Sequence, residues 1–185
     1  MKIKMSFFDL SYQDKREKMR LFAKSNSFAY EMKLFIIDEI IKKMCLINKE
    51  ILLGINIEDL LNKLLTDGYV AYERVFDDKQ KKIINYNEID PCSLVIDTDD
   101  GKPIWIQYHE NPSIKRVLLE SQVLYLKYPI LDANESLIGQ IYTKQIKLYT
   151  HEKLNDFIIN YVVDNVFEYI SEIVEKESDF KNQLQ

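Results

Sequence analysis

The chain has 185 residues, of which 46% are apolar and 30% are charged, and its net charge is −5. This length suits one ordinary domain or a small domain with an appended helical part, and the composition is typical of a soluble globular protein. An acidic chain gains nothing from counterion release on nucleic-acid phosphate, which disfavours a dedicated DNA- or RNA-binding module. No signal-peptide pattern and no apolar run of about 18 residues occur, so no membrane span is expected.

The N-terminal part is predicted to be helical from residue 12 to residue 45. Ser25, Asn26 and Ser27 are expected to interrupt it and to divide it into two helices. The first helix has a solvated face rich in Lys, Arg and Glu. Its apolar face is predicted to begin with Met19, Leu21, Phe22 and Ala23.

A further helix is predicted over residues 56–67. Asn56 is the expected N-cap, and Gly68 stands at the C-terminal stop, where a positive φ is often needed. The spacing of the apolar residues indicates one buried stripe. That stripe consists of Ile57, Leu60, Leu61, Leu64 and Leu65.

After Gly68 the pattern changes to the two-residue period of β-strands. Residues 69–76 alternate as a β-branched and aromatic strand, and a return strand is expected at 83–86 after a polar turn at 77–80. Asp99-Asp100-Gly101 indicates a second hairpin. The middle of the chain is therefore predicted to be a meander-like antiparallel sheet. Its further strands are expected at residues 93–97, 103–109, 115–119 and 122–128.

The C-terminal part is predicted to be a loop with one short element at residues 129–150, followed by a long helix. Thr150 can cap this helix, and Glu152 suits its positive first turn. The polar tail from Glu175 to Gln185 is expected to fray. The apolar stripe is predicted to contain Leu154, Ile158, Tyr161, Val162, Val166, Tyr169, Ile170 and Ile173 and to end near Val174.

These elements together predict an α+β fold. It has N-terminal helices, a central antiparallel β-meander and a long C-terminal amphipathic helix that packs on the sheet through its stripe. Three segments are expected: an N-terminal helical segment (1–55), a helix with the antiparallel meander (56–128), and a loop with the C-terminal helix (129–185).

No residue spacing in the sequence predicts catalysis or a bound metal. The acidic turn that starts at Asp97 fails the EF-hand pattern, because Gly101 is fifth and the twelfth residue is Tyr108. His109 and His151 are far apart, whereas a metal site needs three or four convergent ligands. Phosphate-binding loops and nucleophile motifs do not occur. The sequence therefore predicts no enzyme activity, no cofactor and no metal.

Two weaker chemical interpretations concern carboxylates and thiols. Asp77, Asp78 and Asp90 could form a carboxylate pair for acid–base chemistry, but a Lys-rich turn is normally a solvated loop. Cys45 and Cys92 follow no metal spacing and are expected to be reduced, half-buried thiols.

The charged turn and the aromatic strands are the candidate contact surfaces. Lys79, Lys81 and Lys82 form a small basic cluster, which is best interpreted as a hairpin tip that blocks pairing of strand edges. An aromatic set resembles a stacking surface for bases but is more often core: Trp105, Tyr108, Tyr125 and Tyr128. The predicted assembly or surface contacts are Asp77, Asp78, Lys79, Lys81 and Arg116.

Three blocks of the sequence follow one another in a characteristic order. They run over residues 14–41 (DKREKMRLFAKSNSFAYEMKLFIIDEII), 64–95 (LLTDGYVAYERVFDDKQKKIINYNEIDPCSLV) and 102–128 (KPIWIQYHENPSIKRVLLESQVLYLKY). Together they resemble the wing region of the portal vertex protein family of contractile-tailed bacteriophages of the T-even type. Residues that carry the resemblance include Arg16, Arg20, Asp38, Glu39, Asp67, Gly68, Tyr69, Tyr72, Glu73, Asp77, Asp78, Lys79, Gln80, Lys81, Ile84, Asp90, Pro91, Trp105, Gln107, Tyr108, Pro112, Lys115, Arg116, Leu118, Ser121, Gln122, Tyr125 and Tyr128.

The resemblance implies a virion structural protein. A portal is a ring of subunits at one capsid vertex, through which DNA is packaged and ejected. The implied partners are further copies of the chain, in a ring if the chain is complete, and the capsid, terminase and neck proteins. The implied location is the capsid vertex, and the host cytoplasm during assembly. Specific nucleic-acid binding is not implied. Family members are much longer, and their stem, clip and channel loop are not visible in residues 129–185, so only the wing region is matched.

Two other functions are alternatives. The chain could be a stand-alone protein-interaction domain with no catalytic activity and no virion role. It could also be a small enzyme or a nucleic-acid binder that uses the surface of Trp105, Tyr108 and Tyr125. Burial of those aromatic side chains would argue against the last function.

Overall fold

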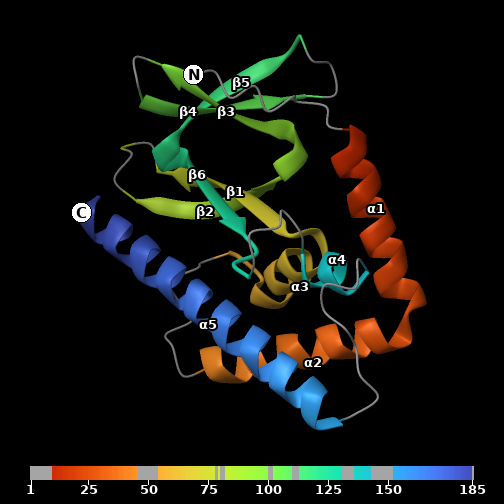
Figure 1. Ribbon diagram of the computed structural model, residues 1–185. Helices are drawn as coiled ribbons and strands as arrows, with labels where there is room; N and C mark the ends of the chain where they lie inside the picture. The colour runs from red at the N-terminus through yellow and green to blue at the C-terminus, as the bar shows by residue number, and fades with distance from the viewer. Residues whose placement is uncertain are drawn as a thin grey trace.

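The computed structural model of the chain describes residues 10–45, 54–77, 79, 82–99, 102–109, 113–130, 136–142 and 152–184. These ranges contain five α-helices and six β-strands. Figure 1 shows the strands in the upper half of the molecule, α2, α3 and α5 below them, and α1 along one side. The predicted α+β class, with N-terminal helices, antiparallel strands and a long C-terminal helix, is confirmed.

The N-terminal region forms two helices, as predicted. Helix α1 spans Leu10–Ser25, and α2 spans Ser27–Met44. Between them, the Asn26 side chain accepts a hydrogen bond from the amide of Ala29 at 2.9 Å, which caps the first turn of α2. The predicted break is therefore a helix cap.

The apolar face of α1 differs in part from the prediction. Ala23 is buried, and Met19 and Phe22 pack against the core, but the side chain of Leu21 is 66% exposed. Helical geometry explains the difference, because successive residues are about 100° apart around the axis. A run of adjacent apolar residues therefore extends beyond the face that the core can cover.

Helix α3 spans Ile57–Asp67 and has both predicted end signals. The Asn56 side chain accepts a hydrogen bond from the amide of Asp59 at 3.2 Å, and Gly68 follows the helix with a φ of 87°. The predicted stripe is confirmed by the burial of Leu60, Leu61, Leu64 and Leu65.

Replacement of Gly68 by alanine is expected to lower the free energy of unfolding by about 1 kcal/mol or more. The positive φ disfavours any side chain, and an added Cβ would lie 3.2 Å from the amide nitrogen of Ser136. Chemical denaturation measures the loss. Asparagine tolerates this φ better, so Gly68→Asn should cost less than Gly68→Ala if backbone strain dominates. An unchanged stability of Gly68→Ala would contradict the argument.

The strands form two three-stranded sheets, and all paired strands are antiparallel. The inner sheet has the order β2-β1-β6, with β1 at Tyr69–Phe76, β2 at Ile83–Ile89 and β6 at Val123–Lys127. The outer sheet has the order β3-β4-β5, with β3 at Leu94–Asp99, β4 at Lys102–Tyr108 and β5 at Lys115–Leu119.

This division refines the predicted meander. β3, β4 and β5 follow one another as a meander, but β6 pairs with β1 of the inner sheet, with Tyr69 opposite Lys127. Short 3-10 turns at Pro91–Ser93 and Glu120–Gln122 carry the chain between the two sheets. Burial of apolar surface favours the arrangement, because a second, smaller apolar cluster joins residues of both sheets. Its buried members are Ala71, Ile89, Leu118 and Val123.

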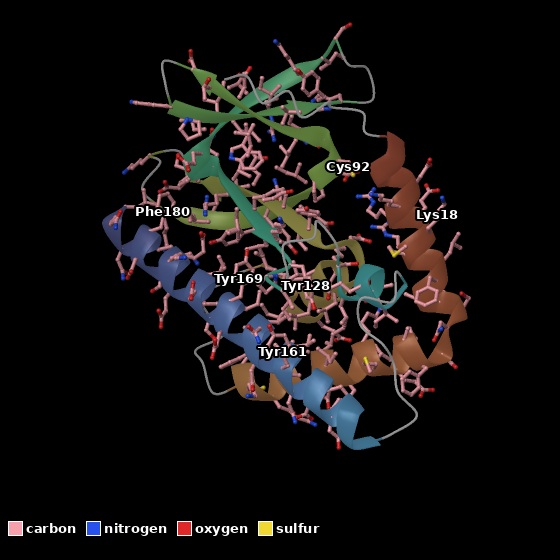
Figure 2. All side chains as sticks on the ribbon, in the orientation of Figure 1. Lys18, Cys92, Tyr128, Tyr161, Tyr169 and Phe180 are labelled. Atoms are coloured by element: carbon pink, nitrogen blue, oxygen red, sulfur yellow. The ribbon has the colours of Figure 1, made fainter. Side chains whose placement is uncertain are left out.

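The C-terminal helix, α5, spans Glu152–Gln183 and is longer than predicted. The expected fraying from Glu175 onward is wrong, because Glu177 is buried and accepts a hydrogen bond from Arg74 of β1. Helix α5 was predicted to pack on the sheet through its stripe, but it packs mainly against α2, and its C-terminal end reaches the inner sheet (Figure 2). There the ring of Phe180 meets that of Phe76 edge-on, with centroids 6.3 Å apart.

The buried stripe of α5 recurs every fourth residue. Tyr161, predicted to belong to it, is 50% exposed, because it lies about 100° around the helix axis from its buried neighbour. The predicted cap Thr150 and the side chains of Leu154 and Ile158 lie outside the described part of the chain. The stripe consists of the buried residues Val162, Val166, Ile170 and Val174, and Val163 and Glu177 are buried as well.

The short element expected between residues 129 and 150 is α4, Leu137–Tyr142. Its buried Gln140 donates a hydrogen bond to the carbonyl of Ile130 at 2.9 Å. All five helices and the inner sheet contribute to one main core. Tyr128 is buried in this core, near the centre of the molecule (Figure 2).

Candidate functional site

The predicted charged turn is held by local hydrogen bonds. The Asp77 amide donates to the carbonyl of Lys82 at 2.9 Å, and the Lys82 amide donates to Oδ1 of Asp77 at 3.2 Å. Lys79 is exposed, whereas Asp78 and Lys81 lie outside the described residues. The turn therefore closes the β1–β2 hairpin, and its described residues do not converge on a reactive centre.

Arg116 lies elsewhere, between the two sheets. Its guanidinium donates to Oε2 of Glu73 at 2.8 Å and to Oε1 of Gln107 at 2.9 Å. Glu73 belongs to β1 of the inner sheet, and Gln107 belongs to β4 of the outer sheet. Arg116 thus joins the two sheets.

Two arginines join α1 to the body of the fold. Arg16 donates to both carboxylate oxygens of Asp90, at 2.8 and 3.3 Å. Arg20 donates to both oxygens of Asp67, at 2.9 and 2.5 Å. Each pair is bidentate, the geometry that best fixes the orientation of a guanidinium and a carboxylate. Asp90 therefore has a cationic partner, and none of its hydrogen bonds involves a second carboxylate.

In the Arg16–Asp90 pair, hydrogen bonds offset the effect of partial burial on the pKa of each group. Burial alone would raise the pKa of Asp90, but hydrogen bonds from Arg16 and from the Cys92 amide hold that pKa below its ordinary value. Burial likewise works to lower the pKa of Arg16, and the bond to Asp90 raises it overall. Both groups are therefore charged at neutral pH.

Two members of the aromatic set, Trp105 and Tyr125, pack between the sheets, Tyr128 lies in the main core, and Tyr108 is partly buried. The Trp105 and Tyr125 rings have centroids 5.0 Å apart, and Tyr125 also lies against Tyr69, at 5.8 Å. Tyr128 is only 2% exposed. These rings offer little free surface on which bases could stack, so the structure weakens the nucleic-acid hypothesis.

The described residues contain no cluster of His, Cys, Asp and Glu that could hold a metal ion. His109 is exposed, and His151 lies outside the described part of the chain. Both cysteines are free, and Cys45 is exposed rather than half-buried as predicted, whereas Cys92 is partly buried. None of the helices in the described ranges is long and apolar enough to cross a membrane.

A buried ionic cluster on β1 and α5 was missed by the sequence analysis. Arg74 donates to both carboxylate oxygens of Glu177, and the Tyr86 hydroxyl donates to Oε2 of Glu177 at 2.8 Å. Arg74 also donates to the carbonyls of Ser121 and Val123. Arg74 and Glu177 are 103 residues apart in the chain, so no local pattern indicates the pair.

A cleft between α1, α2 and α3 was missed as well. It has a volume of about 790 Å³, and Lys33 of α2 lies in its wall. Lys33 is one of the buried residues of α2 even though it is charged. A signal was present in the sequence, because Lys33 stands four residues from both Ala29 and Ile37, which belong to the buried face of α2.

No family model matches the chain, and no curated protein matches it significantly.

Proposed function

We propose that this chain is a virion structural protein that resembles the wing part of a phage portal. Its expected partners are further copies of the chain and the capsid, terminase and neck proteins of the same particle. Its expected location is the capsid vertex, and the host cytoplasm before assembly. In this role the chain supplies a rigid platform and performs no chemical reaction.

The observation that carries the proposal is that charged residues of the three matching blocks form ion pairs with one another. Arg16 and Arg20 of the first block bond to Asp90 and Asp67 of the second. Arg116 of the third block bonds to a carboxylate of the second. Residues that distinguish the resemblance thus connect its blocks with one another, as expected for a structural platform rather than a catalytic centre.

The outer sheet offers a surface for a neighbouring copy. Leu118 is buried toward the inner sheet, so its neighbours Val117 and Leu119 point to the opposite face, where they are 54% and 58% exposed. We call it the free face of the outer sheet, because none of the described α-helices makes extensive contact with β3, β4 or β5. Its apolar residues, from the strand register, are Val95, Ile104, Val117 and Leu119, which surround the buried Ile106.

Helices α1 and α2 carry a second set of exposed apolar side chains: Leu21, Phe28, Tyr30, Leu34 and Phe35. Two different apolar surfaces on one chain suit the head-to-tail contact from which rings are built. We therefore assign the free face of the outer sheet to contact with a neighbouring copy.

Replacement of Val117 by aspartate is expected to weaken self-association of the chain about tenfold or more, because a charge would be buried in the contact. Sedimentation at several protein concentrations measures the association constant. Lys115→Gln, at the polar end of the same strand, is the control and should change it little. Equal association of Val117→Asp and the unaltered chain would rule out this surface.

The virion role is tested in particles purified from cells that carry the coding region. Gold-labelled antibodies against the chain should mark one vertex of each particle in electron micrographs, and peptides of the chain should be found in the purified particles. Absence of the chain from the particles would contradict the proposal. If the chain then still self-associates through the outer sheet, the stand-alone interaction domain is the better function.

A further inference from the structure

The cleft between α1, α2 and α3 has a buried lysine at its wall. Lys33 is 5% exposed, and the residues around its ammonium group also line the cleft. Lys33 Nζ donates to Oδ1 of Asn62 at 2.6 Å and to Oγ1 of Thr66 at 3.3 Å, and it lies 5.4 Å from the centre of the Tyr30 ring. The ammonium group therefore points into the cleft.

The immediate partners of this ammonium group are uncharged. An ammonium group has three N–H donors, and the bonds to Asn62 and Thr66 occupy two of them. Asp67 attracts Lys33 from a distance, but its carboxylate is bonded to Arg20. Burial lowers the pKa of Lys33, as expected for a cation that has no carboxylate in direct contact.

The other basic groups of the cleft are already paired or exposed. Arg20 bonds to Asp67, and Lys63 bonds to Asp59 at 2.5 Å and to Glu88 at 2.6 Å. Lys24 is exposed to solvent. In all, four basic and three acidic side chains line the cleft, so one positive charge is in excess, and Lys33 is the buried one.

One side of the cleft is apolar, within a lining that is otherwise polar or charged. Ala23 and Ile37 are buried, while Leu34 and Tyr30 line it with partly exposed side chains. An apolar side next to an oriented cation suits a small group that has a charged end and a carbon skeleton. A carboxylate fits this site better than a phosphate, because only one buried cation is available to neutralise it.

We propose that this cleft binds a carboxylate that carries an apolar group, with the Lys33 ammonium as its ion-pair partner. The bound carboxylate accepts the third N–H of Lys33, and its carbon skeleton contacts Leu34 and Ile37. The proposal stands without the virion role, and only its second-copy source rests on the outer-sheet contact proposed above. The carboxylate could belong to a free small acid or to an acidic side chain of another protein copy, and the two sources have the same chemistry.

The test uses hexanoate as the probe and hexanamide, its neutral analogue of the same shape. Two-dimensional NMR of the 15N-labelled full chain should show saturable shifts at the amides of Ala23, Ile37 and Asn62 with hexanoate. Hexanamide should bind at least roughly tenfold more weakly than hexanoate, because it has no negative charge to pair with the Lys33 ammonium group. In the unaltered chain, hexanoate should also raise the pKa of Lys33, followed through its Cε resonance.

The matched variants are Lys33→Met and Lys18→Met. Lys33→Met keeps the length of the side chain without its charge, and should weaken hexanoate binding roughly tenfold or more while the melting temperature stays equal or rises. Lys18 lies on the outer side of α1, away from the cleft (Figure 2), so Lys18→Met removes the same charge and should change binding less than about twofold.

The source of the carboxylate follows from the self-association of the full chain. Loss of association in both Lys33→Met and Asp97→Asn would identify an acidic side chain of the outer sheet of another copy. Hexanoate binding with unchanged association would identify a separate acid. Equal binding of hexanoate and hexanamide, or an unaltered pKa of Lys33 at saturation, would overturn the proposal even if Lys33→Met failed to fold.

Discussion

Replacement of Glu177 by glutamine is expected to lower the free energy of unfolding by about 3 kcal/mol or more, among the largest single-residue effects in this chain. Arg74 has a side chain only 11% exposed, and its guanidinium would lose the carboxylate that neutralises it. The Tyr86 hydroxyl would lose a charged acceptor for its hydrogen bond at the same time. Chemical denaturation, followed by circular dichroism, measures the loss.

The same helix provides a matched control. Glu172 and Lys176 form an ion pair at 3.5 Å on the surface of α5, with side chains 65% and 70% exposed. Glu172→Gln removes the same charge by the same substitution, yet it should change stability by less than about 0.5 kcal/mol, because solvent screens exposed pairs. Equal effects of the two substitutions would show that Glu177 is not a buried anchor.

A double substitution separates the ion pair from its burial. Arg74→Leu combined with Glu177→Leu removes both charges, so neither is left buried without a partner. The double variant should therefore lose less stability than the sum of the two single variants, by about 1 kcal/mol or more. If the losses simply add, Arg74 and Glu177 act separately and the bidentate contact contributes little.

The contrast between α3 and α5 shows what could be predicted from the sequence. Asn56 and Gly68 identify the ends of α3 because a helix cap depends on residues within one turn of it. The end of α5 depends instead on Arg74, which is distant in the chain. The sequence alone therefore predicts a polar, frayed tail, because it does not show that Glu177 pairs with Arg74.

The candidate site divides in the same way. Alternation along the strands indicated that Trp105 and Tyr125 face a core, and the structure places them against each other. The pairing of β6 with β1 could not be predicted in this way. Alternation along a strand shows which side chains share a face, but it does not show which strands pair. The partners of Arg16 and Arg116 were unpredictable for this reason, since both contacts follow from how the elements are arranged in space.

Replacement of Leu64 by alanine is expected to lower the free energy of unfolding by about 3 kcal/mol. Leu64 is fully buried in the stripe of α3, which packs against α1, α2, α4 and β1, so the vacated space borders several elements that cannot all move inward. Denaturant titration of the purified variant measures the loss.

Leu21→Ala is the control for this substitution, because it deletes the same atoms from a side chain that is 66% exposed on α1. Its effect should stay within about 0.5 kcal/mol. The pair of variants tests burial directly, since both leucines stand in apolar runs of helical sequence and only their position around the helix differs. A large loss for Leu21→Ala would mean that another surface covers α1 in solution, as a neighbouring copy seated on α1 and α2 would do.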